Sequence, residues 1–259
     1  MSIQLKHWPY PRWIAHRGAG KLAPENTVAA FRVGASHGYR MFECDVKLSA
    51  DGILFLLHDD TLLRTTNSPE HLGELASGVG SDHLWRTLSQ LDAGSWHSQP
   101  FAGEPLPCFE NIARYCLQNG YFLNIEIKPT PGQEFETGQV VAHHAARLWQ
   151  DAIVKPLLTS FNTEALTAAH KVQPHLPRGL LLDSLAPDWL ETALTLDCAA
   201  IVCEQSLWNP VSLTQAKNAG FRTLSYTVNE ESVAQRLINL GLDSLITDRV
   251  DLFSTCATY

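Results

Sequence analysis

The sequence has no long apolar run and only a modest number of basic residues, and each absence excludes a class of protein. No segment of the 259 residues is apolar over the roughly 18 or more positions that a membrane-spanning helix requires. The 19 Lys and Arg residues are outnumbered by 27 Asp and Glu, which gives a net charge of −8, and they form no basic cluster of the kind that binds nucleic acid. We therefore expect neither a nucleic-acid partner nor stable membrane association.

A cysteine pattern and a secretory leader are also absent. The six cysteines, at positions 44, 108, 116, 198, 203 and 256, form no C-x-x-C pair and no compact zinc-binding spacing, so we interpret them as reduced core residues. Residues 1–9 lack the apolar segment and small-residue cleavage site of a signal peptide. These features predict a cytoplasmic protein.

The sequence does contain a regular alternation of short apolar runs with amphipathic stretches, which is typical of βα units and a parallel sheet. The expected strands are Trp13–His16, Met41–Leu48, Tyr121–Ile127, Pro156–Ser160, Gly179–Leu182, Ala200–Cys203, Arg222–Thr227 and Ser244–Thr247, with Ile53–His58 as a hairpin partner of the second. The expected helices are Thr27–His37, Phe109–Asn119, Phe135–Gln150, Thr163–His170, Pro187–Leu196, Ser212–Ala219 and Ser232–Leu240. Eight strands separated by helices favour a closed (β/α)8 TIM barrel.

A doubly wound open sheet is the alternative α/β fold. The barrel is favoured because the polar residues described below follow several different strands, and because no G-x-G-x-x-G follows the first strand. Residues 59–107 interrupt the βα rhythm with a long irregular stretch, and such a stretch inside a domain is usually functional. We expect a single TIM-barrel catalytic domain over residues 1–259, with an insertion at about 59–107 that follows the hairpin and covers the substrate.

Two acidic residues lie close together on the second expected strand. Glu43 and Asp45 are two positions apart, so their side chains lie on the same face, whereas Cys44 faces away. The flanking residues are mostly apolar, and two like charges in such surroundings repel each other and are costly to desolvate. A bound cation between the two carboxylates is the simplest remedy.

Further charged residues lie at the ends of the first and third of the eight expected strands. Glu126 adds a third hard oxygen ligand, and the three carboxylates suit one divalent cation, Mg²⁺ or Ca²⁺. Arg17 carries a planar fork that can hold two phosphate oxygens, and Lys128, two residues beyond Glu126, adds a second positive charge on the same face. This combination predicts a site for a phosphate ester.

Two histidines complete the expected site. His16 and His58 each come at the end of an expected strand, and imidazole exchanges protons in both directions near neutral pH. We interpret them as the general acid and the general base, and the sequence does not decide which is which. Neighbouring residues are open to two readings: Glu25 and Asn26 either support the site or begin the first helix, with Asn26 as its N-cap, while Phe161, Tyr226 and Trp96 either line the substrate pocket or belong to the core.

An ordered set of short motifs resembles the glycerophosphodiester phosphodiesterase family. The motifs are His16-Arg17-Gly18, Pro24-Glu25-Asn26-Thr27, Glu43-x-Asp45, Asp51-Gly52, His58-Asp59, Leu91-Asp92-Ala93-Gly94-Ser95-Trp96, Glu104-Pro105-Leu106-Pro107, Glu126-x-Lys128, Ser160-Phe161, Tyr226-Thr227-Val228-Asn229 and Ile246-Thr247-Asp248. Each motif alone is weak, but the ordered set is specific and covers nearly the whole chain. In size and in its expected location the chain is similar to the short cytoplasmic bacterial members.

The resemblance implies metal-dependent hydrolysis of glycerophosphodiesters, such as glycerophosphocholine and glycerophosphoethanolamine, to sn-glycerol 3-phosphate and an alcohol. It also implies that a cyclic phosphate can form on the way. Two other functions stay open: a phosphoinositide-type phospholipase C-like lyase, and a noncatalytic module that binds glycerophosphodiesters. The alcohol preference, the identity of the ion and any homo-oligomeric state are not fixed by the sequence.

Overall fold

Eight parallel strands form a ring in the computed structural model, which describes residues 7–73 and 78–253. The ring strands are β1 (Trp13–Ala15), β2 (Met41–Leu48), β4 (Phe122–Ile127), β5 (Leu157–Ser160), β6 (Arg178–Leu182), β7 (Ala200–Glu204), β8 (Arg222–Tyr226) and β9 (Ser244–Thr247). Each pairs with the next along the chain, and β1 pairs with both β2 and β9, which closes the ring. The predicted barrel is therefore confirmed, and the alternative prediction of an open sheet is wrong.

The remaining strand, β3 (Leu54–Leu56), lies outside the ring and pairs antiparallel with β2. Leu48 pairs with Leu54 and Val46 pairs with Leu56. The chain therefore runs to the end of β2, turns, and comes back along the last residues of β2. The expected hairpin is confirmed. Its return direction matters for the site, because it carries His58 back to the level of the β2 carboxylates.

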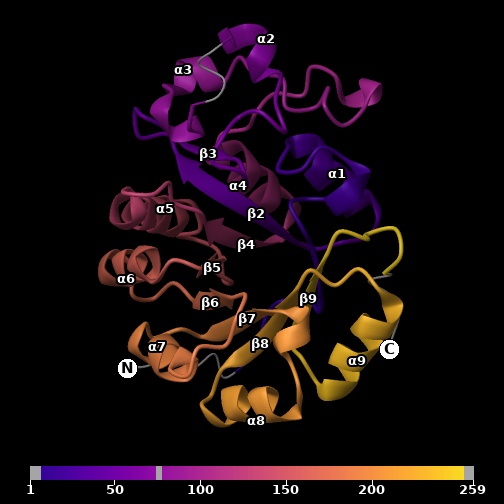
Figure 1. Ribbon diagram of the computed structural model, residues 1–259, viewed down its shortest axis with the longest axis vertical. Coiled ribbons are helices and arrows are strands. Elements are labelled where there is room, and N and C mark those ends of the chain that lie inside the picture. Colours follow the sequence, from indigo (N-terminus) through magenta and orange to yellow (C-terminus); the bar gives the residue numbers. More distant parts are fainter. Residues whose placement is uncertain (1–6, 74–77, 254–259) are drawn as a thin grey trace.

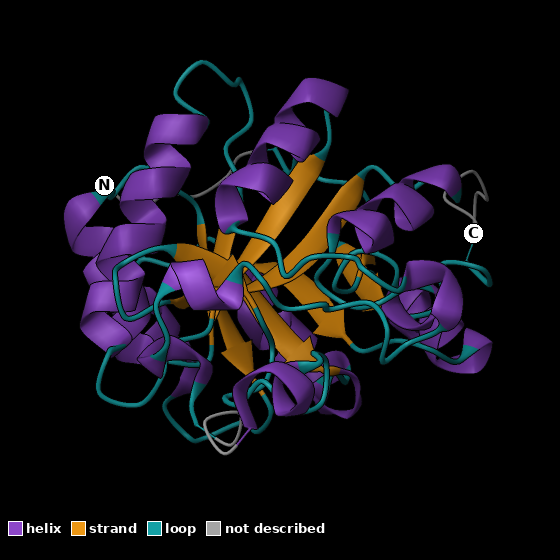
Figure 2. Cartoon of the chain, turned by 90° about the horizontal axis from the view of Figure 1, so that it is seen from above, coloured by secondary structure: helices purple, strands orange, loops and turns teal. Residues whose placement is uncertain are grey.

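At least one helix lies in each interval between consecutive ring strands, and one helix from each interval packs around the strands (Figures 1 and 2). These helices are α1 (Val28–Ser36), α4 (Phe109–Asn119), α5 (Glu134–Leu148), α6 (Thr163–Val172), α7 (Trp189–Thr195), α8 (Pro210–Asn218) and α9 (Glu231–Leu240). Most ends match expectation within two residues. Helix α8 begins earlier because Asn209 caps it, accepting from the backbone N–H groups of Val211 and Ser212, and Pro210 suits the first turn.

The segment between β3 and α4 forms a small body beyond β3, at one end of the molecule in Figure 1. It contains the short helices α2 (Ser68–Leu72) and α3 (Trp85–Leu88) and the 3₁₀ turns η3 (Gly80–Asp82) and η4 (Gln99–Phe101). Together with Phe55 of β3, its buried side chains form a separate cluster, which consists of Phe55, Leu57, Leu62, Leu88, Leu91, Ala93 and Leu106. We call this cluster the outer core.

The barrel itself has two apolar layers. The larger layer lies between strands and helices and includes Cys44, whose side chain thus faces away from the barrel axis as expected. The smaller layer contains inward residues such as Ile14, Met41, Val202 and Ile246, and forms the floor beneath the polar site. Among the described cysteines, all are free and four are buried, while Cys256 lies outside the described residues.

Within residues 7–73 and 78–253, no helix is long and apolar enough to cross a bilayer. The longest described helix, α5, has 15 residues and carries acidic groups in its first turn. A bilayer-spanning helix needs about 20 residues.

A buried arginine at the start of β6 joins two loops at the amino-terminal end of the barrel. The Arg178 guanidinium donates to the backbone carbonyls of Leu176 (2.7 Å), Asp197 (2.9 Å) and Pro174 (3.2 Å), and its side chain is fully buried. Burial lowers the pKa of Arg178. The cost of burying this charge is offset by the carbonyl acceptors, which would in turn lose their donor if the side chain were shortened.

We expect Arg178→Met to lower the free energy of unfolding by about 3 kcal/mol, because several buried carbonyls would lose their donor. Urea denaturation followed by circular dichroism measures the change. Arg147→Met is the matched control, because Arg147 is 54% exposed and its ion pair with Glu110 is worth less than about 1 kcal/mol. Equal midpoints for the two variants would contradict the role of Arg178 as a clamp.

Candidate active site

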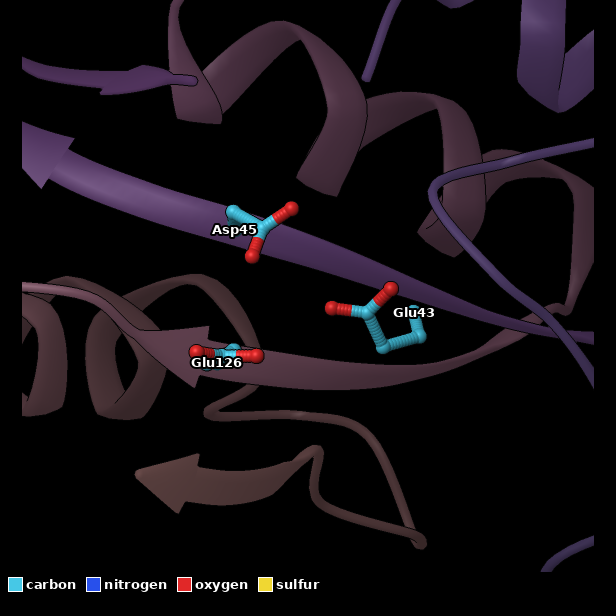
Figure 3. Close-up of side chains that lie close together, drawn as sticks. All are labelled: Glu43, Asp45 and Glu126. Atoms are coloured by element: carbon cyan, nitrogen blue, oxygen red, sulfur yellow. The ribbon is translucent and has the colours of Figure 1, made fainter. Parts of the chain in front are cut away.

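Three carboxylates converge at the carboxyl ends of two neighbouring strands. Glu43 and Asp45 extend inward from β2 and Glu126 from β4, where Asp45 and Glu126 face each other in register. Figure 3 shows the three groups directed into the same space. Each offers one oxygen such that all three oxygens lie within 4.8 Å of one another, which is the spacing of a possible metal site.

Burial and mutual repulsion disfavour the charged forms of two of the three carboxylates. Burial raises the pKa of Glu43 to about 8, and the nearby charge of Asp45 adds to the effect. Burial and the charge of Asp45 also raise the pKa of Glu126. The Oε1 atom of Glu43 is buried and accepts no hydrogen bond within the described chain. Three hard oxygen donors with one unpartnered oxygen fit a divalent cation such as Mg²⁺ or Ca²⁺.

Two basic side chains lie beside the carboxylates. The Lys128 ammonium donates to Glu126 Oε1 at 3.0 Å and lies 3.6 Å from Asp45 Oδ1. The Arg17 guanidinium donates to Glu25 Oε1 at 2.8 Å, and its Nε lies 3.3 Å from Asp45 Oδ2. Burial raises the pKa of an acid, but the charges of Arg17 and Lys128 outweigh it and lower the pKa of Asp45. Asp45 is therefore the carboxylate that stays ionised.

The backbone at Arg17 is held in an unusual conformation. Arg17 has a φ of 50°, in the left-handed region that costs a non-glycine residue about 1–3 kcal/mol. This conformation directs its N–H to Glu43 Oε2 at 2.9 Å. The next residue, Gly18, has a φ of 99°, and a Cβ there would lie 2.8 Å from the Ala30 Cβ. The glycine of the His16-Arg17-Gly18 motif is thus required by its backbone conformation and by the lack of space for a side chain.

Asn26 supports the cluster, and the interpretation of this residue as a helix N-cap is wrong. Thr27 caps α1, accepting from the Ala30 N–H, whereas Asn26 has a φ of 61° and is buried. The Asn26 amide donates to Asp45 Oδ2 at 2.8 Å and its oxygen accepts from the Asp45 N–H at 3.1 Å. Both Asn and Thr suit N-caps, so the local rule alone could not choose between them.

His16 lies directly after β1 and is oriented by a carboxylate from the far end of the chain. Its Nδ1 lies 2.7 Å from Asp248 Oδ1, and its Nε2 lies 3.8 Å from Glu43 Oε2. Asn229 holds Asp248 in turn, donating to Oδ2 at 2.9 Å and accepting from the Asp248 N–H at 2.9 Å. Burial would lower the pKa of His16, but the Asp248 hydrogen bond and the Glu43 charge outweigh it and raise the pKa.

His58 has a similar partner but different surroundings. Its Nδ1 lies 2.8 Å from Asp59 Oδ1, and Asp59 also accepts two hydrogen bonds from Arg64, at 2.6 and 2.8 Å. Burial lowers the pKa of His58, and the positive charges of Arg17 and Lys128 act in the same direction. The surroundings therefore favour the protonated form of His16 and the neutral form of His58, although each ring has a carboxylate at its Nδ1.

One pocket joins most of these residues, and we call it the central pocket. Its empty space, which is partly open to solvent, is about 530 Å³. Its lining consists of His16, Arg17, Glu43, His58, Asn124, Glu126, Lys128, Phe161, Leu181, Tyr226, Thr227 and Ile246. Phe161 and Tyr226 meet edge to face with ring centroids 5.8 Å apart. Asp45 lies behind the wall, and Glu25 and Trp96 line a neighbouring pocket instead.

Three residues that support the site were not predicted from the sequence. Asp248 and Asn229 occur in motifs of the resemblance, but nothing local indicates that they orient His16. Arg64 donates to both Glu25 and Asp59, and so connects the carboxylates that hold Arg17 and His58. The pairing of His58 with Asp59, by contrast, could have been predicted from their adjacent positions, because a carboxylate beside an imidazole commonly orients the ring.

A closed barrel whose carboxyl ends carry two carboxylate-paired imidazoles, an acidic cluster and two basic side chains defines a barrel hydrolase of anionic esters. The comparison with known families agrees: residues 16–252 match the model of the glycerophosphoryl diester phosphodiesterase family. The chain belongs to this family and is an enzyme of its class.

Individual relatives cover almost the whole chain. It is 32% identical over 240 residues to a glycerophosphodiester phosphodiesterase of Caldanaerobacter subterraneus, covering 91% of this chain and 93% of the relative. A phosphodiesterase of Oleispira antarctica, solved with the product sn-glycerol-3-phosphate, superposes with a TM-score of 0.83 at 35% identity, over 92% and 93% of the two chains. The glycerophosphodiester phosphodiesterase of Agrobacterium tumefaciens superposes with a TM-score of 0.77 at 25% identity, covering 94% of this chain and 99% of the Agrobacterium chain.

We expect Asp248→Asn to lower kcat by at least about 100-fold with little change in KM, because His16 would lose the carboxylate that orients its ring. Steady-state release of sn-glycerol 3-phosphate measures both constants. Asp251→Asn is the control, because it makes the same substitution three residues further on, where the exposed carboxylate forms an ion pair with Arg249. A kcat for Asp248→Asn within threefold of the wild type would contradict the role.

Proposed function

We propose that this enzyme hydrolyses glycerophosphodiesters, glycerophosphocholine and glycerophosphoethanolamine among them, to sn-glycerol 3-phosphate and an alcohol. The observation that carries the proposal is the central pocket, on which both imidazoles, both basic side chains and two of the three clustered carboxylates open together. The product bound in the Oleispira relative supports the glycerol phosphate half. His16 and His58 act as the general acid and base in this proposal.

Glu43, Asp45 and Glu126 would hold one divalent cation, Mg²⁺ or Ca²⁺. The unpartnered Oε1 of Glu43 and the convergence of three carboxylate oxygens within 4.8 Å of one another support this assignment. When bound, the cation would neutralise phosphate charge and orient the ester. Arg17 and Lys128, which both line the central pocket, would hold the phosphate.

The proton transfers follow from the positions of the two histidines. One imidazole accepts the proton of the attacking hydroxyl, either a water or the glycerol 2-hydroxyl, as its oxygen forms a bond to phosphorus. The other donates a proton to the alcohol oxygen as that P–O bond breaks. Asp248 and Asp59 hold the two rings by their Nδ1 atoms, so each Nε2 is left for the substrate. Attack by the 2-hydroxyl would give a cyclic phosphate that water then opens.

We also propose that residues 1–259 work as a single catalytic domain in the cytoplasm, with an insertion at about 59–107. The insertion side chains Arg64 and Trp96 border the neighbouring pocket, which supports a role in covering the substrate. The five cysteines that the structure describes are all free, which is compatible with a reducing compartment. Phe161 and Tyr226 would contact the glycerol carbons, and Glu25 would hold Arg17 in place.

Phosphorus NMR of the purified enzyme with glycerophosphocholine and Mg²⁺ or Ca²⁺ tests the function. We expect the diester resonance to be replaced by that of sn-glycerol 3-phosphate, and the same result with glycerophosphoethanolamine. Binding of both diesters without turnover would instead indicate a binding module. Cleavage of vesicle phosphatidylinositol, with both soluble diesters intact, would indicate the phospholipase C-like alternative.

A further inference from the structure

A second pocket adjoins the central pocket, and we call it the side pocket. It shares His16 and Arg17 with the central pocket and is otherwise lined mainly by Lys21, Glu25, Arg64 and Trp96. Its empty space is about 790 Å³, larger than that of the central pocket. The two pockets thus lie on either side of the residues that would bind the phosphate and move a proton.

A phosphodiester has two organic halves, and the two pockets differ in a way that assigns them. The central pocket contains His58 and two carboxylates of the acidic cluster, and it ends on the apolar floor residues Leu181 and Ile246. Its limited space suits the glycerol half, which is the same in every substrate. The side pocket is bordered by exposed side chains, with Trp96 38% and Arg64 45% exposed, so it can admit alcohols of different size.

The charges of the side pocket are unequal. Its carboxylates are already paired: Glu25 binds Arg17 and Arg64, and Asp248 binds His16 and Asn229. The ammonium group of Lys21, by contrast, has no ion-pair or hydrogen-bond partner within residues 7–73 and 78–253. The side pocket therefore offers one uncompensated positive charge to whatever enters it.

The position of Lys21 is fixed by the surrounding loops. Its backbone N–H donates to the Asp248 carbonyl at 3.2 Å, and its own carbonyl lies 3.1 Å from Nε2 of His97, a residue of the insertion. The 3₁₀ turn η1 (Gly20–Leu22), which contains Lys21, is thus held between the last barrel strand and the insertion. Lys21 is therefore anchored through its backbone beside the side pocket.

The aromatic residue of the side pocket does not favour a cationic alcohol. A quaternary ammonium binds best over an open aromatic face. The Arg64 guanidinium already lies 6.0 Å from the Trp96 ring centroid. A second cation at this ring would lie close to Arg64, and like charges close together repel each other.

From these observations we propose that the side pocket is the subsite for the leaving alcohol and that Lys21 makes it favour alcohols that carry an anionic group. The inference rests on the proposed hydrolysis of glycerophosphodiesters and adds the chemical class of the alcohol. Lys21 acts here as a specificity-determining residue, through an exposed charge pair with the substrate. Cationic alcohols remain substrates, with lower kcat/KM.

Two substrates that differ by one charge test the proposal. Glycerophosphoethanolamine acylated with a succinyl or a butyryl group gives alcohols of nearly equal size, in which a carboxylate replaces a methyl group. For the wild type we expect kcat/KM for the succinyl substrate to exceed that for the butyryl substrate by about threefold, the size of an exposed ion pair. The ratio should fall to about one in Lys21→Gln and below one in Lys21→Glu.

Lys171→Glu is the matched control, because it makes the same charge change on α6, outside both pockets. We expect its succinyl-to-butyryl ratio to equal that of the wild type. Equal kcat/KM values for the two substrates in the wild type, or a ratio that Lys21→Gln leaves unchanged, would overturn the inference while leaving the proposed function intact. No hydrolysis of either substrate or of glycerophosphocholine would overturn the proposed function itself.

Discussion

His16→Ala and His58→Ala are each expected to lower kcat by about 10²–10⁴-fold, the contribution of a positioned acid or base. Each ring lines the central pocket and is held at Nδ1 by a carboxylate, so each has a free Nε2 for proton transfer. The loss should appear in kcat more than in KM, because Arg17 and Lys128 would still bind the phosphate. Release of sn-glycerol 3-phosphate from glycerophosphocholine measures the effect.

His143→Ala is the control for these variants. His143 lies on α5, away from the central pocket, and its Nδ1 contacts only Gln173 among the described side chains. Its kcat should equal that of the wild type. Circular dichroism melting should show that both site variants remain folded. Full activity in either His16→Ala or His58→Ala would remove that residue from proton transfer.

Glu43→Gln is expected to abolish turnover and to weaken divalent-cation binding by more than about 100-fold. Loss of a group that merely supports a metal ligand already costs about 10–100-fold in affinity, so loss of a ligand should cost more. Calorimetric titration with Ca²⁺ or Mg²⁺ measures the affinity directly. A chelator should likewise abolish turnover of the wild type, and added cation should restore it.

Thermal melting gives a second readout that does not depend on turnover. A cation at 100 times its Kd should stabilise the wild type by about 2.7 kcal/mol, but should leave the melting temperature of Glu43→Gln almost unchanged. Without cation, Glu43→Gln should be at least as stable as the wild type, because it removes one of three mutually repelling acids. Glu136→Gln, an exposed change on α5, is the control. Equal cation affinity in Glu43→Gln and the wild type would refute the metal assignment.

The features that were predictable from the sequence are those that depend on local pattern. The alternation along β2 placed Glu43 and Asp45 on one face and Cys44 on the other, because the side-chain period of a strand is fixed. Helix α4 was predicted at both ends, since its apolar periodicity stops at Gly120, which has the left-handed conformation of a C-cap.

Contacts between distant segments could not be predicted in the same way. Asp248 lies 232 residues from its partner His16, and only closure of the ring between β1 and β9 brings them together. His58 was expected at the end of a hairpin strand that pairs with β2. Strand β3 ends earlier, at Leu56, so His58 lies in the loop two residues beyond it. Strand β3 runs antiparallel, so the hairpin returns His58 to the cluster from the opposite direction.

Because of the hairpin, the catalytic residues are held by two hydrophobic clusters of very different size. His16 and the acidic cluster are held by the barrel, whereas His58 follows Leu57, which is buried in the outer core. The outer core has seven buried members, and so small a body releases little free energy when it forms. We therefore expect heating to stop turnover while the ring of strands is still intact, so that the working temperature of the enzyme is set by its smallest hydrophobic cluster and not by its largest.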